Sequence, residues 1–201
     1  MNKLFLDIET LPAESEKHKT LKEIFDKRIT DGKTVTDFED FVAQTTFDGA
    51  FGRICCISYA FNDEKPVSLS GDEKDIIIEF WKVAKQAELF IGFNLLNFDL
   101  RFIYQRSVIY NILPSIDLNF ARFRNFPIFD VMQEWNKWDT RATISLDTLA
   151  KALGIPSSKG GKVEGKNVAQ AYVDGRIKEI CEYCEKDVEV TRKIYKRLTF
   201  S

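Results

Sequence analysis

The apolar and polar positions along the chain first predict a short strand and a hairpin. Four of the six residues in the segment 3–8 (KLFLDI) are apolar, which is typical of a buried strand, and the sequence Thr10-Leu11-Pro12 ends it. Residues 53–61 (RICCISYAF) are apolar and rich in strand-forming side chains, residues 62–66 form a turn, and residues 67–70 resume as a short strand. We expect this hairpin to lie beside the first strand.

Apolar residues at helical spacing predict most of what remains. Residues 13–47 are charged and carry such spacing, so we expect two surface helices inserted before the hairpin. A helix over residues 72–88 precedes a strand over residues 89–93, and residues 98–110 are again helical. Two further helices are predicted at residues 145–153, between an N-cap Ser145 and Gly154, and at residues 176–198.

This order of elements predicts an α/β fold. An antiparallel hairpin followed by alternating helices and strands is typical of a mixed β-sheet with helices on both faces. The length of 201 residues and the 44% hydrophobic content allow a substantial core. We therefore expect a single domain over residues 1–201, with residues 13–47 as a helical insertion and residues 156–165 as the one linker-like stretch.

Composition narrows the partners without identifying them. The net charge of -2 provides no broad basic field, so any contact with nucleic acid must be local. The cysteines form two close pairs, Cys55-Cys56 and Cys181-x-x-Cys184, which suggest reduced thiols, since no second pair completes a zinc site. We find no signal-peptide pattern and no apolar run long enough for a bilayer, and expect a cytoplasmic protein without membrane contact.

Asp7 and Glu9 are the first candidates for chemistry. Side chains alternate along a strand, so these two carboxylates point to the same side at the end of a buried strand. Burying two unpaired like charges costs several kcal/mol unless a cation is present. The alternative is that both carboxylates only cap the strand at its solvent edge.

Two further carboxylates follow in other segments. Asp99 lies between a strand and a helix, where the commonest role of an Asp is the helix N-cap. Asp187 follows Tyr183 by four residues in a helix, which places the phenol and the carboxylate on one face. Because this helix is rich in Glu and Lys, a solvated charged face is the alternative for Asp187.

In chain order, these residues match the motifs of a known family. The sequence resembles the DEDD 3′-to-5′ exonucleases of ribonuclease H-like fold, in the subgroup with a tyrosine in the third motif. It is similar to the proofreading exonuclease domain of B-family DNA polymerases from residue 3 to about residue 197, with residues 13–47 as the weakest part. No polymerase domain accompanies it, which suggests a free-standing relative. The motifs are Asp7-Ile8-Glu9-Thr10, the segment from Gly92 to Asp99 (GFNLLNFD) and Tyr183-x-x-x-Asp187.

The resemblance implies an activity and a set of ligands. It implies hydrolysis at the 3′ end of single-stranded DNA with release of nucleoside 5′-monophosphates, and two Mg²⁺ or Mn²⁺ ions. Tyr183, with Glu9, would orient the attacking water. Oxygen ligands without a nearby thiolate or imidazole also favour Mg²⁺ or Mn²⁺ over zinc. The implied metal ligands are Asp7, Glu9, Asp99 and Asp187.

Substrate contacts are also implied by the resemblance. Thr10 and Asn94 correspond to positions that touch the terminal nucleotides, and Phe98 to an aromatic side chain against which the last base packs. Stacking suits an enzyme that accepts any base, because every base has a π-face. For Phe98 the alternative is ordinary core packing.

Several other residues have weaker claims. His18 lies outside every motif, so a histidine base is not expected, and Asp130 is interpreted as a helix cap. Scattered basic residues of the middle region and of a Gly-rich loop are candidates for phosphate contacts. These basic residues are Arg101, Arg106, Arg122, Arg124, Lys137, Arg141, Lys159, Lys162 and Lys166.

Two alternative functions remain open at this stage. An RNA exonuclease of the same superfamily would use the same carboxylates, and sugar selectivity depends on contacts to the 2′-hydroxyl that sequence does not place. A non-catalytic nucleic-acid-binding module could keep the fold, but decayed sites usually lose a ligand, and here all four carboxylates and the tyrosine remain.

Overall fold

The computed structural model describes residues 1–33, 36–139 and 141–201. Its centre is a mixed five-stranded sheet with the order β3-β2-β1-β4-β5. Strand β1 pairs with β2 in antiparallel and with β4 in parallel orientation, so it lies in the middle of the sheet. The strands are β1 (Lys3–Leu11), β2 (Arg53–Phe61), β3 (Val67–Ser70), β4 (Leu89–Gly92) and β5 (Ile128–Asp130).

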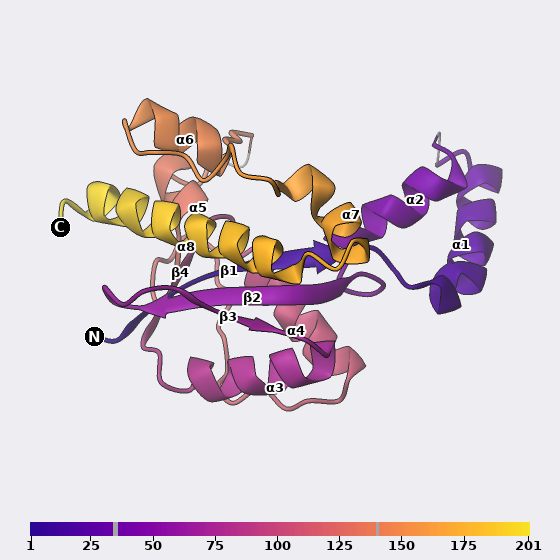
Figure 1. Ribbon diagram of the computed structural model, residues 1–201, viewed down its shortest axis with the longest axis horizontal. Coiled ribbons are helices and arrows are strands. Elements are labelled where there is room, and N and C mark those ends of the chain that lie inside the picture. The colour runs from indigo at the N-terminus through magenta and orange to yellow at the C-terminus, as the bar shows by residue number, and fades with distance from the viewer. Residues whose placement is uncertain (34–35, 140) are drawn as a thin grey trace.

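Helices cover both faces of this sheet, as Figure 1 shows. Helices α3 (Glu73–Ala84) and α4 (Asp99–Ile109) lie on one face. The long helix α8 (Ile177–Thr199) crosses the other face, and the two helices inserted between β1 and β2 project from one end of the molecule. The remaining helices are α1 (His18–Thr30), α2 (Phe38–Gln44), α5 (Val131–Asn136), α6 (Leu146–Ala152) and α7 (Val168–Val173), with 3₁₀ turns η1 (Ser15–Lys17), η2 (Thr45–Phe47) and η3 (Gly165–Asn167).

The alternation of β1 decides which side chains face which helical layer. Leu4, Leu6 and Ile8 are buried in the core cluster that contains the apolar residues of α3 and α4. Phe5, in the opposite phase, packs edge-on against Tyr195 of α8, with ring centroids 5.4 Å apart. Asp7 and Glu9 share the phase of Phe5, so both carboxylates lie on the α8 side.

Most of the predicted elements are confirmed, with differences at their ends. The hairpin and the two inserted helices are present. The first strand does not end at residue 8, because Thr10 and Leu11 still pair with Ile54 and Arg53 of β2. Asp7 and Glu9 therefore lie inside a strand rather than at its end, with a register shift directly after Glu9.

Other predictions about local structure were incomplete or wrong. The helix over residues 72–88 is shorter, since α3 ends at Ala84. Strand β5 and helices α5 and α7 were not predicted, because each is only three to six residues long. The segment 156–165 is not a linker: Ser158 and Val163 within it are buried. Of the helices described, none is both long and apolar enough to cross a membrane.

Candidate active site

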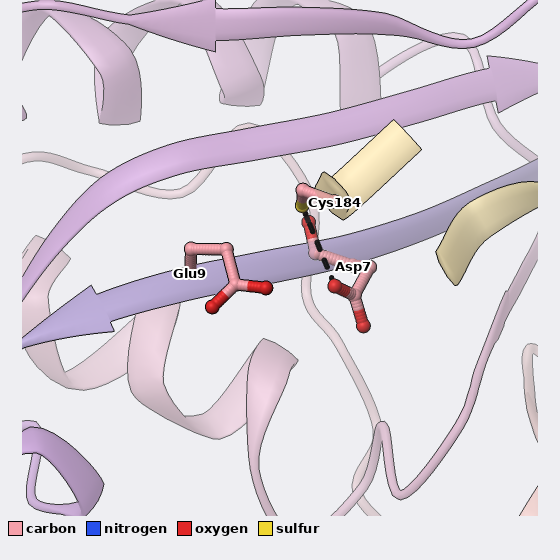
Figure 2. A group of neighbouring side chains, drawn as sticks. All are labelled: Asp7, Glu9 and Cys184. Carbon is pink, nitrogen blue, oxygen red and sulfur yellow. Dashed lines mark hydrogen bonds between the residues drawn. The ribbon is translucent and has the colours of Figure 1, made fainter. Parts of the chain in front are cut away.

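Asp7 and Glu9 project from β1 toward α8 (Figure 2). Their partners in the antiparallel register are Ser58 and Cys56 of β2, whose side chains line the same face. Cys184 of α8 donates from its Sγ to the main-chain oxygen and to Oδ2 of Asp7, each at 3.4 Å. The two carboxylates thus lie between the sheet and the long helix.

Asp99 reaches this place because the sheet opens beside β1. Strand β4 pairs only with Lys3–Phe5 of β1. The main-chain N–H of Ile8, further along β1, therefore has no strand partner on that side. Asp99 Oδ1 accepts a hydrogen bond from the Ile8 main-chain N–H at 3.1 Å. The carboxylate therefore bonds to a different element rather than acting only as a cap of α4, whose N-cap residue is Phe98.

The turn from β4 into α4 is held by close packing and by Asp130. A Cβ on Gly92 would lie 3.0 Å from the Leu6 main-chain oxygen, so the turn can approach β1 only through glycine. Asn94 adopts the left-handed conformation with φ 59°. Asp130 accepts hydrogen bonds from the Asn94 and Leu96 N–H groups at 3.1 and 3.0 Å. It also caps α5, as predicted from the sequence.

Asp187 comes from α8, on the same side of the sheet as Asp7 and Glu9. Its side chain is only 7% exposed. Its Oδ1 is buried and, among the residues described, has no hydrogen-bond partner. The Ser158 and Tyr183 hydroxyls lie close enough to lower the pKa of Asp187 against the larger effect of burial. A buried carboxylate oxygen without a partner is costly, which points to a missing positive charge.

The charge of Asp187 raises the pKa of each of the other three carboxylates, in addition to the effect of burial. Burial is the largest cause for Asp7, and the charges of Asp99, Asp187 and Glu9 add to it. Burial and then Asp187 raise the pKa of Glu9, and burial raises the pKa of Asp99 to about 7 although the Ile8 N–H opposes the shift. Four acidic groups from three separate elements therefore share one electrostatic site.

A substitution at Asp99 tests this electrostatic coupling. A carboxyl with a raised pKa binds a proton in the folded state that the unfolded chain has lost, so wild-type stability falls as pH rises from about 4 to about 7. Asp99→Asn removes the titration and keeps an oxygen for the Ile8 N–H. In metal-free buffer, the variant should gain stability over wild type between about pH 4 and about pH 7, by about 1.4 kcal/mol per unit of pKa shift. Urea titrations at both pH values measure it; a difference independent of pH would contradict the shift.

The close ligand atoms fit a divalent cation, and they include a sulfur atom as well as carboxylate oxygens. Ligand atoms of Asp7, Glu9 and Cys184 all lie within 4.8 Å of one another. The sequence argument that no thiol is near the carboxylates is therefore wrong. Cys184 was seen only as part of a Cys-x-x-Cys pair, and its three-residue distance from Asp187 was the overlooked signal, since both then share a helix face.

The three predicted substrate residues lie around this site in different settings. Thr10 Oγ1 donates to the Thr46 main-chain oxygen at 2.7 Å, which ties β1 to η2. Asn94 Oδ1 accepts from Asn97 Nδ2 at 3.3 Å. Phe98 is half-buried and packs against Phe102 on its inner side, with centroids 5.6 Å apart.

Phe47 is an aromatic side chain that sequence reasoning missed. It lies 6.2 Å from Phe98 between ring centroids and is 67% exposed. Phe98 therefore combines core packing with an exposed aromatic neighbour. The signal in the sequence was weak, because Phe47 lies in the charged insertion, far from every motif.

The basic residues suggested for phosphate contact differ in their burial and in their distance from the carboxylates. The predicted phosphate contact of Arg106 is wrong, because this side chain is buried in an ion pair with Glu73 at 2.8 Å. Lys159 lies close enough to lower the pKa of Asp187, so the Gly-rich loop does reach the site. Lys162 and Lys186 line a cleft together with Tyr183. His18 lies in α1, outside the site, with its ring edge-on to Phe38.

A comparison with protein families decides the class of the protein. Residues 48–201, well over half of the chain, match the family described as "Predicted 3'-5' exonuclease related to the exonuclease domain of PolB". The chain belongs to this exonuclease family. The match includes Asp99, Tyr183 and Asp187, whereas Asp7 and Glu9 precede it.

Comparison with solved structures supports the fold of this exonuclease. The chain is similar to the family B DNA polymerase from the hyperthermophilic archaeon Pyrobaculum calidifontis, with a TM-score of 0.69 and 14% sequence identity. The similarity covers 99% of this chain but only 24% of the polymerase. The mixed ribonuclease H-like sheet expected from the sequence is thereby confirmed. No curated protein matches the sequence.

Proposed function

We propose that this exonuclease hydrolyses phosphodiester bonds at the 3′ end of single-stranded DNA and releases nucleoside 5′-monophosphates. Two divalent cations, Mg²⁺ or Mn²⁺, would be held by Asp7, Glu9, Asp99 and Asp187. One observation carries the proposal: Asp7 and Glu9 of β1 lie close together, and the charge of Asp187 on α8 raises the pKa of both and of Asp99 on α4. Such a cluster is stable at neutral pH when cations neutralise it.

The buried carboxylate oxygens are suited to hard cations. Asp187 Oδ1 is buried without a partner, and Asp99 keeps one oxygen beyond the one that accepts from Ile8. Carboxylate oxygens are the ligands that Mg²⁺ and Mn²⁺ prefer. When bound there, two such ions would supply positive charge to the oxygens of the scissile phosphate and of the attacking water.

Tyr183 would position the attacking water. Burial raises the pKa of its phenol, and the charges of Asp187, Glu9 and Asp7 raise it further. The phenol is therefore protonated at neutral pH, and it can orient a water by hydrogen bonding but does not serve as a strong base. A Cβ on Gly165 would lie 3.9 Å from the Tyr183 hydroxyl, so the Gly-rich loop passes beside it.

A cleft at the turn that precedes Asp99 supports a single strand of nucleic acid as the substrate. A cleft beside Asn94 is lined by the guanidinium-bearing Arg101 and Arg122 and by the aromatic Phe123 and Trp138. Cations for phosphates and aromatic rings for bases are the usual parts of a single-strand site. We assign Thr10, Asn94 and Phe98 to the terminal nucleotides, with Phe98 and its neighbour Phe47 as the stacking surface.

End-labelled single strands of DNA test the polarity and the metal requirement together. With Mg²⁺, a 3′-labelled strand should release labelled mononucleotide at once, whereas a 5′-labelled strand should shorten stepwise. A chelator should stop both reactions. Early release of the 5′ label as mononucleotide, or digestion that continues in the chelator, would overturn the proposal.

The same assay separates the two alternative functions. Faster digestion of a matched RNA strand than of DNA would identify an RNA exonuclease. Absence of any digestion, together with calorimetry that detects no Mn²⁺ binding, would identify a non-catalytic binding module.

A further inference from the structure

The thiol of Cys184 lies directly beside the carboxylates of Asp7 and Glu9. The side chain is fully buried on α8. Its Sγ lies 3.4 Å from Asp7 Oδ2, and the ligand atoms of Asp7, Glu9 and Cys184 are mutually within 4.8 Å (Figure 2). A sulfur and two carboxylates are thus already gathered within the span of a single coordination sphere.

The other three cysteines lie outside this group of close ligand atoms. Cys56 and Cys181 contact each other, with their Sγ atoms 3.4 Å apart. Cys55 Sγ donates to the Glu9 main-chain oxygen. Within residues 1–33, 36–139 and 141–201, the only group of three or more close metal-ligating side chains is Asp7, Glu9 and Cys184.

A second observation indicates that this place is built for a cation. Asp187 follows Cys184 by three residues, so both side chains lie on the face of α8 that meets the sheet. The Asp187 carboxylate is nine-tenths buried, and its Oδ1 has no hydrogen-bond partner among the described residues. The charge of Asp187 acts on both Asp7 and Glu9, which places it at the same site.

We propose that Cys184 is a sulfur ligand of this site and gives it a preference for thiophilic divalent cations, Zn²⁺ or Cd²⁺, over Mg²⁺. Binding breaks the S–H bond of Cys184: the electron pair stays on sulfur and forms the bond to the cation, and the proton passes to the solvent. Thiolate ligands select softer cations than carboxylates do. The inference rests on the metal site of the proposed function and adds the chemical class of cation that competes for it.

Cadmium titration tests the proposal directly. A cadmium–thiolate bond produces a charge-transfer band in the ultraviolet, whereas carboxylate ligands produce none. Wild type should show a band that saturates at one equivalent of Cd²⁺. Cys184→Ser should lose the band and bind Cd²⁺ at least about tenfold more weakly. Cys181→Ser is the matched control, since Cys181 lies one turn earlier on the same helix and outside the group, and it should keep the band.

Each outcome decides for or against the sulfur ligand. A wild-type protein without the band, a band that persists in Cys184→Ser, or a band lost in Cys181→Ser would overturn the proposal. Thermal melting of the metal-free variants checks that they fold. If Cys184→Ser fails to fold, cadmium NMR of the wild type still distinguishes a site with sulfur from an all-oxygen site, because sulfur ligation shifts the resonance strongly downfield.

Digestion of labelled single strands in Mg²⁺ by the same preparations separates this inference from the proposed function. A cadmium band without any digestion would overturn the proposed exonuclease reaction and leave the sulfur ligand in place. Normal digestion without a band would overturn the sulfur ligand alone. If both hold, Zn²⁺ should inhibit the wild type in the presence of Mg²⁺, and Cys184→Ser should relieve that inhibition at least about tenfold.

Discussion

Substitution of Asp187 by alanine should lower the rate of 3′-end digestion by at least about 10³-fold, or about 4 kcal/mol of activation free energy. Asp187 contributes a buried oxygen that no described group of the protein satisfies. In the proposed reaction this oxygen binds a cation, so its removal should weaken the charge that stabilises the scissile phosphate. Digestion of a 5′-labelled single strand in Mg²⁺ measures the loss.

The fold should survive the same substitution. Asp187→Ala removes one of several repelling charges from a buried cluster, so the metal-free variant should melt at the wild-type temperature or above it. Glu182→Ala is the matched control, because Glu182 is an exposed carboxylate on the same helix, and its activity should not change. Tyr183→Phe should lose only part of the activity and keep metal-induced stabilisation. A purified Asp187→Ala protein with wild-type digestion would exclude Asp187 from the reaction.

The second large effect concerns stability and lies away from the carboxylate cluster. Glu73 and Arg106 form an ion pair in which both side chains are only 8% exposed. Glu73 Oε1 also accepts from the Ile54 N–H at 2.6 Å, and Oε2 accepts from the Tyr110 hydroxyl at 2.8 Å. The Glu73 carboxylate of α3 therefore connects three places: Arg106 within α4, Tyr110 at the C-terminal end of α4, and Ile54 at the start of β2.

Replacement of Glu73 by alanine should reduce the free energy of unfolding by about 3–5 kcal/mol. The substitution leaves the Arg106 guanidinium buried without its countercharge and the Ile54 N–H without its acceptor. Urea denaturation measures the change. Glu79→Ala on the same helix removes an exposed pair with Lys82 and should cost no more than about 1 kcal/mol. Equal effects of the two substitutions would contradict the role assigned to the buried pair.

Periodicity in the sequence was enough to predict which residues share a face, and the motifs could be found from the sequence alone. Alternation along β1 places Asp7 and Glu9 on one side, because a strand has a period of two residues. Helical spacing likewise places Tyr183 and Asp187 on one face of α8. These local periods, and the chain order of the acidic motifs, were sufficient to predict the mixed sheet and the exonuclease family. Assignment of cations and nucleotides to these residues stays a prediction.

The contacts between distant segments could not be predicted from the sequence and became visible in the folded chain. Asp99 bonds to the Ile8 amide across 91 positions of the chain, and Cys184 contacts Asp7 across 177. Arg106, which the sequence suggested for phosphate contact, instead pairs with Glu73 inside the protein. Such contacts depend on how the helices pack on the sheet, and a periodicity specifies the face of an element but not what that face will touch.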